Sequence, residues 1–163
     1  MPETVINPET GDPISMEIEG LRMTPQRREV YRVVLENRNH PTAHDVYVQA
    51  KERLPHISLA TVYSCLEALV RHGVVRQVNF EREPSRFCPN LEEHGHFCDC
   101  RTGEIRDVKF KPGVKLTDFL DLPEGTEIAA VEILLRGELP EDTSQTNQPK
   151  TNQTTESSHV PEH

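Results

Sequence analysis

Residues 58–73 read SLATVYSCLEALVRHG, and this stretch predicts an amphipathic helix that begins at a capping serine and ends before a glycine. Its apolar residues recur with helical spacing, which gives the helix one face directed at a core. Ser58 and Thr61 carry hydroxyls that can bond phosphate, and Tyr63 can pack on a thymine methyl or bond a phosphate. The stretch is therefore interpreted as a helix that enters the major groove of DNA. The alternative is an ordinary capped helix with Tyr63 in the core.

Two helices are predicted before this stretch and a hairpin after it. Thr24 is the expected N-cap of the first helix. Thr42 is expected to cap the second, where Asp45 three residues later completes a capping box. After the third helix, residues 74–80 and 86–88 are predicted to be short strands joined by a polar turn. Three helices followed by a hairpin predict a winged helix-turn-helix.

The sequence pattern changes after residue 89. Residues 94–100, 104–110 and 127–136 are predicted strands, and residues 115–122 are a predicted short helix. The last strand is apolar on both faces, so a partner subunit is expected to cover one of them. We therefore expect an α+β chain in which an N-terminal winged helix-turn-helix domain is followed by a small C-terminal α/β dimerisation domain.

The chain is expected to divide into four parts. The last part is almost entirely polar and cannot offset the entropy of ordering. The parts are a flexible N-terminal segment (1–20), a winged-helix DNA-binding domain (21–88), a dimerisation and metal-binding domain (89–140) and a disordered tail (141–163).

Composition narrows the possible functions. The chain has 163 residues, 34% of them hydrophobic, and no apolar run approaches the roughly 18 residues needed to cross a bilayer. Its amino terminus lacks the features of a secretory signal, so we expect a cytoplasmic protein with no membrane association. The net charge is −9, yet residues 21–80 contain nine Lys and Arg against five Asp and Glu. This basic module in an acidic chain favours nucleic acid as a partner.

Five side chains have the spacing of metal ligands: His40, Cys88, His94, His96 and Asp107. His94 and His96 lie two residues apart on a predicted strand, so their imidazoles face one side. Asp107 belongs to the neighbouring predicted strand. His40, taken alone, is more typical of a capping or surface histidine.

Cys98 and Cys100 share the predicted strand face of the two histidines. Two histidines and two cysteines form a ligand set typical of structural zinc, so His94, His96, Cys98 and Cys100 could bind an additional zinc ion. The favoured interpretation is that both cysteines are buried thiols, and a redox role stays open. The chain lacks a secretory signal, so its cysteines are expected to lie in a reducing compartment. Cysteines near histidines in such a compartment favour metal binding over disulfide formation.

Several motifs occur in an order and spacing that resemble the ferric uptake regulator family. The resemblance covers about residues 20–137 and implies a homodimeric, metal-responsive winged-helix protein that binds double-stranded operator DNA. Arg22 matches a position that reaches the minor groove, and Tyr63 matches one that contacts bases. Ser64 departs from the arginine of some members. The motifs are LRMTPQR at 21–27, HPTA at 40–43, SLATVY at 58–63, SRF at 85–87 and HGHF at 94–97.

The resemblance also implies a regulatory site with one divalent metal per subunit. The family has histidines at the positions of His40, His94 and His96, and an acidic residue at that of Asp107. Cys88 departs from the usual acidic residue, and a thiolate favours zinc, with iron(II) or manganese as the alternatives.

The family's second, structural zinc is predicted to be absent. Most members hold it with two Cys-x-x-Cys pairs. The first pair's positions fall on Asp99 and Thr102 here, and residues 138–142, where the second pair would follow, contain no cysteine.

The sequence thus predicts a metal-dependent transcriptional regulator, expected to be a repressor, and not an enzyme. One alternative is a winged-helix regulator that ignores metal and senses a small ligand or thiol oxidation. A more distant alternative is a small metal-dependent hydrolase, which would need a general base that the sequence does not supply convincingly.

Overall fold

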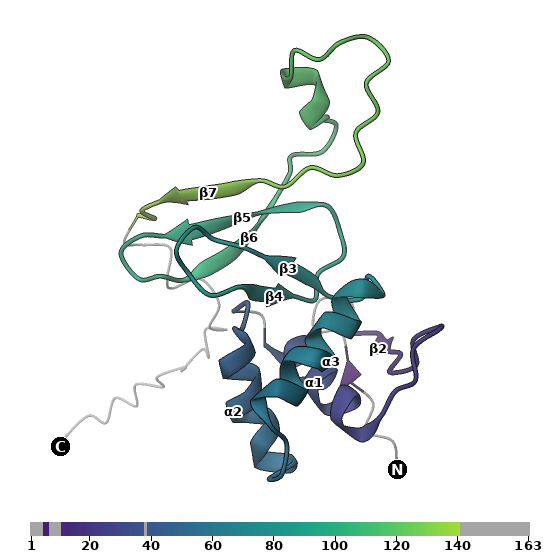
Figure 1. Ribbon diagram of the computed structural model, residues 1–163. Coiled ribbons are helices and arrows are strands. Elements are labelled where there is room, and N and C mark those ends of the chain that lie inside the picture. Colours follow the sequence, from purple (N-terminus) through teal and green to yellow (C-terminus); the bar gives the residue numbers. More distant parts are fainter. Residues whose placement is uncertain (1–4, 7–10, 38, 141–163) are drawn as a thin grey trace, which may run out of the picture.

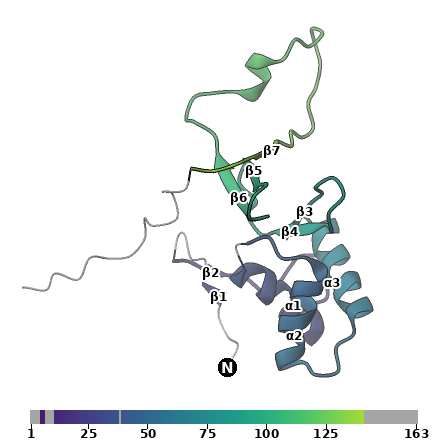
Figure 2. The same cartoon turned by 90° about the vertical axis from the view of Figure 1, so that its left-hand side faces the viewer.

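The computed structural model describes residues 5–6, 11–37 and 39–140 (Figures 1 and 2). The tail predicted to be disordered, residues 141–163, lies outside the described residues. None of the helices in the described ranges combines the length and apolar character needed to span a membrane. In chain order the elements are β1 (Val5–Ile6), β2 (Pro13–Ile14), α1 (Pro25–Glu36), α2 (Ala43–Arg53), α3 (Leu59–Arg71), β3 (Arg76–Val78), β4 (Arg86–Cys88), β5 (His94–Asp99), β6 (Ile105–Lys109), the 3-10 helix η1 (Leu116–Phe119) and β7 (Leu134–Gly137).

Each of the three α-helices begins at the predicted capping residue. The Thr24 side chain accepts a hydrogen bond from the backbone N–H of Arg27. Thr42 and Asp45 form the reciprocal capping box, with Thr42 N donating to Asp45 Oδ2 at 2.9 Å. Ser58 accepts from the third residue of α3 at 3.1 Å. These caps satisfy backbone donors that a helix leaves free at its start, and they confirm the predicted helix starts.

The three helices pack pairwise around one apolar core. The apolar face predicted for α3 packs on this core: Val62, Leu66 and Leu69 are buried, and Val70 is partly buried. Leu66 and Leu69 are among the most completely buried side chains. Tyr63 lies on the opposite side of α3 and is 56% exposed. The alternative interpretation, in which Tyr63 belongs to the core, is therefore wrong.

The wing is the antiparallel pair β3 and β4, in which Arg76 lies opposite Cys88. On its other side β4 makes an antiparallel bridge between Arg86 and Thr42. The backbone N–H of Phe87 also donates to the carbonyl of Pro41 at 3.0 Å. These bonds fix the chain just before α2 against the strand that ends in Cys88.

The second module is a three-stranded sheet of order β6-β5-β7. β5 pairs with β6 antiparallel, and His96 stands opposite Asp107. β5 pairs with β7 parallel. Together with the three helices and the wing, this sheet confirms the predicted architecture of a winged helix followed by a small α/β domain.

The wing lies against this sheet, so the two modules meet at a defined seam (Figure 1). Arg136 of β7 donates to the carbonyl of Glu81 in the wing turn at 3.1 Å. A small apolar cluster fills the seam and consists of Val78, Phe80, Cys88, Cys98 and Ile105.

The N-terminal segment expected to be flexible contains ordered structure. β1 and β2 pair antiparallel, and Val5 is buried against the three-helix core. Ile14, Met16 and Ile18 pack on the same core. The sequence analysis predicted a flexible segment over residues 1–20, and the described part of it places its apolar residues against the apolar surface of the helices.

The last predicted strand and the helix before it are shorter than expected. The sequence predicted a strand over 127–136, whereas β7 covers only Leu134–Gly137. Leu134 lies opposite His96, two residues after the start of β5. The predicted strand residues 127–131 therefore lie beyond the start of β5, where that strand offers no residue to pair with. The predicted helix over 115–122 is a single 3-10 turn over Leu116–Phe119.

The core makes a prediction about stability. Leu69 has no exposed surface, and Leu69→Ala would leave a cavity among the three helices. We expect this substitution to lower the free energy of unfolding by about 2–5 kcal/mol, measured by urea denaturation followed by circular dichroism. Val48→Ala on the exposed side of α2 is the control, with an expected change within about 0.5 kcal/mol. Equal stabilities of the two variants would contradict this description of the core.

Candidate metal centre

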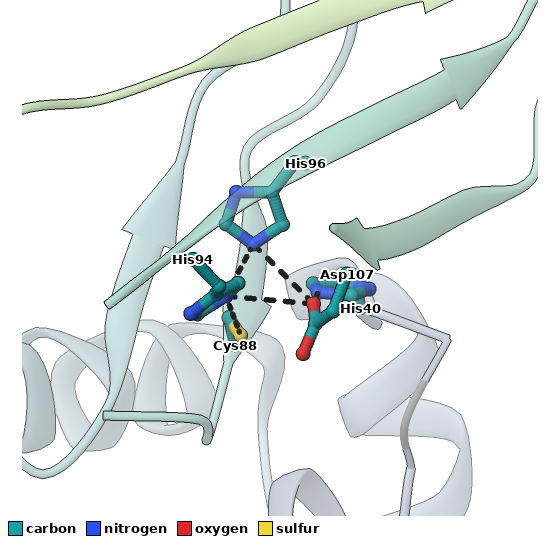
Figure 3. Close-up of side chains that lie close together, drawn as sticks. All are labelled: His40, Cys88, His94, His96 and Asp107. Atoms are coloured by element: carbon teal, nitrogen blue, oxygen red, sulfur yellow. Dashed lines mark hydrogen bonds and ion pairs between the residues drawn. The ribbon is translucent and has the colours of Figure 1, made fainter. Parts of the chain in front are cut away.

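Five side chains converge at the seam between the modules, and they are the five that the sequence analysis selected (Figure 3). One ligand atom from each of His40, Cys88, His94, His96 and Asp107 lies within 4.8 Å of the other four. Four of the residues are buried, and the side chain of Asp107 is 29% exposed. Nothing else in the described part of the chain groups three or more such residues in this way.

Strand geometry explains how three of the residues meet. His94 and His96 are two apart on β5, so both rings point to one face of the sheet. Asp107 on β6 is the cross-strand partner of His96 and projects on the same side. The sheet therefore supplies two imidazoles and one carboxylate.

The winged-helix module supplies the other two residues. Cys88 is the last residue of β4 and points into the seam. His40 precedes α2 with a φ of 53°, a left-handed conformation that few residues other than glycine adopt. Arg86 donates to the carbonyl of His40 at 3.2 Å and holds this turn in place. The five potential ligand atoms therefore come from both modules, two from the winged helix and three from the sheet.

The distances between the potential ligand atoms suit a single small cation. Two nitrogen ligands at about 2.0 Å from a tetrahedral zinc would lie about 3.3 Å apart. The Nε2 atoms of His94 and His96 are 3.1 Å apart, and His94 Nε2 is 3.5 Å from Cys88 Sγ. Asp107 Oδ1 is 3.4 Å from His94 Nε2 and 3.7 Å from His96 Nε2.

His40 provides a direct test of whether a cation fits. Its side chain is 2% exposed, and neither ring nitrogen completes a hydrogen bond within the described structure. Nε2 nevertheless points at the cluster and lies 2.8 Å from Asp107 Oδ1. A buried nitrogen without a hydrogen bond is costly, and a coordinated metal ion would satisfy it. The residues present therefore fit a divalent metal.

Burial and neighbouring charges shift the pKa values of three of these residues. Burial lowers the pKa of His96 to about 4, with further lowering from His40 and His94, so this ring is neutral and able to coordinate near pH 7. Burial raises the pKa of the Cys88 thiol to about 11. Burial also acts to raise the pKa of Asp107, but the contacts with His40 and Asn90 outweigh it and hold that pKa well below its ordinary value.

Two residues of the loop between Cys88 and His94 support the ligands, and the sequence analysis missed both. The Glu92 carbonyl lies 2.7 Å from His94 Nδ1, a contact that favours the proton on Nδ1 and leaves Nε2 free to coordinate. Asn90 Nδ2 donates to Asp107 Oδ2 at 2.9 Å. Glu92 acts through its backbone carbonyl and Asn90 through its side-chain amide, so only their positions in space reveal these roles.

The residues predicted to contact DNA lie on the surface of the winged-helix module. Arg22 and Ser58 are exposed, Thr61 is partly exposed and Tyr63 is exposed. The hydroxyls of Ser58 and Thr61 lie 2.8 Å from one another at the start of α3. Tyr63 follows on the next exposed position of the same helix.

The other two cysteines of β5 and the turn after it do not join the cluster. Cys98 is buried in the apolar seam, as expected, whereas Cys100 is exposed, so the expectation of two buried thiols is wrong for Cys100. Asp99 accepts hydrogen bonds from the backbone N–H groups of Arg101 and Thr102. Asp99 therefore stabilises the turn in which the family's first cysteine pair would lie.

Comparisons with known proteins agree with this fold. Residues 18–134 match the family described as the ferric uptake regulator family. The peroxide-responsive repressor of Staphylococcus epidermidis is 32% identical over 96 residues, which is 59% of this chain. The match spans 64% of that relative, less than two thirds of its length.

Solved structures give the same result. A zinc-bound manganese uptake regulator is 25% identical with a TM-score of 0.59, and the match covers 74% of this chain and 92% of that one. The peroxide stress regulator of Campylobacter jejuni is 27% identical with a TM-score of 0.59, over 72% of this chain and 88% of that one. The family's members are transcription regulators and not enzymes, which rules out the hydrolase alternative. With the family match extending over most of the chain, the protein belongs to the ferric uptake regulator family.

Proposed function

We propose that this protein is a cytoplasmic, homodimeric repressor that binds operator DNA when a divalent metal occupies the five-residue site. The origin of the ligands carries the proposal. His40 and Cys88 belong to the winged-helix module, whereas His94, His96 and Asp107 belong to the sheet. A metal held by all five would therefore join the two modules and fix the orientation of α3 relative to the sheet.

The seam supports a cross-linking mechanism of this kind. The wing already contacts the sheet through Val78, Phe80 and the bond from Arg136 to Glu81. Metal would add strong bonds to a pre-existing apolar contact and so stabilise this arrangement over others. If this arrangement binds DNA best, metal and DNA strengthen each other's binding reciprocally, with a typical coupling of about 1–3 kcal/mol.

The ligand set favours zinc as the metal. Cys88 provides a soft thiolate beside three imidazoles, and such donors suit zinc better than manganese. The choice of zinc is supported by the similar solved structure, which is described as a zinc-bound manganese uptake regulator. Iron(II) and manganese are the alternatives, since Asp107 also offers oxygen.

A second copy of the chain would cover exposed apolar residues of the C-terminal module. Phe119 is 75% exposed, and it belongs to a stretch with several other exposed apolar side chains. Large apolar side chains that face solvent in such number favour an interface with another protein. The exposed apolar side chains from residue 114 onward are Val114, Phe119, Leu120, Leu122, Ile128, Leu134 and Leu135. A symmetric dimer would present two α3 helices about 34–36 Å apart, or a multiple, to successive turns of DNA.

The exposed start of α3 and the residues before α1 are proposed to contact DNA. Arg22 and Tyr63 are both exposed on a module with an excess of basic residues. We expect Tyr63→Ala and Arg22→Ala each to weaken operator binding by about 1–3 kcal/mol, measured by fluorescence anisotropy, because both remove direct contacts. The control is Val48→Ala, an exposed change on α2. Unchanged affinity in both test variants would contradict this placement of the DNA surface.

Zinc binding is expected to release a proton from Cys88. Because the thiol pKa is raised to about 11, the thiol is protonated at pH 8 and must lose its proton to coordinate. His96, with its pKa lowered to about 4, is already neutral and releases none. Zinc affinity should therefore gain a factor of up to about ten per pH unit from this thiol below its pKa. Calorimetry in buffers of different ionisation enthalpy should count about one proton fewer for Cys88→Ser than for the wild type. Equal proton counts would show that Cys88 is not a ligand.

The identity of the residue at position 88 is expected to set the metal preference. Cys88→Asp exchanges a soft sulfur for a hard oxygen, so zinc should weaken while manganese and iron(II) gain relative to it. Separate titrations of both proteins with the three metals test this expectation. If Cys88 only packs in the seam, the carboxylate would destabilise the protein and leave the order of the metals unchanged.

A further inference from the structure

We infer that Asn90 is a positioning residue that restricts Asp107 to one metal-facing oxygen and so biases the site toward zinc. This inference rests on the proposed metal-dependent function and adds a residue that acts through a ligand. Asn90 follows Cys88 by two residues and lies in the loop that leads into β5. Its side chain reaches across to β6, seventeen residues further along the chain.

The two oxygens of Asp107 have different partners. Oδ1 faces the histidines and lies 2.8 Å from His40 Nε2 and 3.4 Å from His94 Nε2. Oδ2 accepts a hydrogen bond from Asn90 Nδ2 at 2.9 Å. The amide thus holds one oxygen away from the cluster. Figure 3 shows the other oxygen of Asp107 directed at the histidines, where it is left to face a metal.

The amide of Asn90 is itself held in this orientation. Its Oδ1 accepts from the backbone N–H of Glu92 at 3.0 Å, so the amide nitrogen is the end left to face Asp107. The carbonyl of the same Glu92 lies 2.7 Å from His94 Nδ1. One short loop therefore carries two ligands, Cys88 and His94, and orients a third through Asn90.

This arrangement matters for the choice of metal because carboxylates can offer one oxygen or two. Zinc is satisfied by few ligands and accepts sulfur and nitrogen, whereas manganese prefers more ligands and more oxygen. With Oδ2 bonded to Asn90, the site presents one oxygen among five donor residues. Without that bond the carboxylate is free to turn and offer both oxygens, which would help manganese and do little for zinc.

The test compares Asn90→Ala and Asn90→Ser with the wild-type protein. Serine retains an oxygen that can accept from the Glu92 N–H, but its side chain is too short to reach Asp107. Asn90→Ser therefore keeps the turn of the loop and removes only the contact with the carboxylate. Asn79→Ala is the matched control, because Asn79 is an exposed wing residue whose amide oxygen bonds to Gln77 and Ser85. Zinc and manganese are titrated separately, and cobalt(II) serves as a spectroscopic probe of coordination.

We expect the ratio of zinc to manganese affinity to fall about tenfold in both Asn90 variants and to stay unchanged in Asn79→Ala. The visible absorption of bound cobalt(II) should weaken in the Asn90 variants, because a second oxygen from Asp107 raises the coordination number of the ion and its absorption falls as that number rises. An unchanged affinity ratio, or an equal loss for both metals with an unaltered cobalt spectrum, would overturn the inference and leave Asn90 a residue of the loop only. A wild-type protein that binds none of these metals would instead contradict the proposed function itself.

Discussion

The meeting of five potential ligands at the seam is the constraint on which the rest of the structure depends. Buried polar groups are costly unless they are paired, and this cluster buries His40 without a completed hydrogen bond beside two other imidazoles. Burial and the neighbouring histidines keep His96 neutral, while Asp107 carries a negative charge close to all three rings. Such a group of donors, with one carboxylate and one thiol, is satisfied most simply by a cation. This is the physical basis for the proposal that a metal at the seam holds the two modules together.

The wing connects this site to the helices whose exposed residues are proposed to contact DNA. β4 is bonded to the residues before α2, and the same strand ends in Cys88. The hairpin that it forms with β3 packs on the sheet through Val78 and Phe80. Under the proposed function, a metal bound at the site would act on the helices through these backbone hydrogen bonds between β4 and the residues before α2. This connection gives the proposed coupling between metal and DNA a physical route.

Local signals made the helices predictable, whereas contacts between distant residues did not. The helix caps are local interactions, because each capping hydroxyl bonds to a backbone N–H only three residues away. The capping residues are Thr24, Thr42 and Ser58. The five candidate ligands were selected from their chemistry and from the resemblance to a family, and the structure brings them together. Asn90 was missed because an asparagine in a loop resembles any turn residue until Asp107 is placed beside it. The short N-terminal pairing and the limited length of β7 were missed for the same reason, since both depend on which surfaces and strands lie nearby.

The central claim is that metal at the seam controls DNA binding, and a direct measurement can test it. The wild-type protein would be used to select DNA duplexes from a random pool, once in the presence of zinc and once in the presence of a chelator. The duplex that binds best would serve as the probe. Its affinity would then be measured with zinc and with chelator for the wild type and for His96→Ala, which removes one imidazole from the cluster. The account predicts tight, zinc-dependent binding by the wild type, and binding by a folded, dimeric His96→Ala that zinc no longer stimulates. Equal affinity of the wild type with zinc and with chelator would contradict it and favour a regulator that ignores metal.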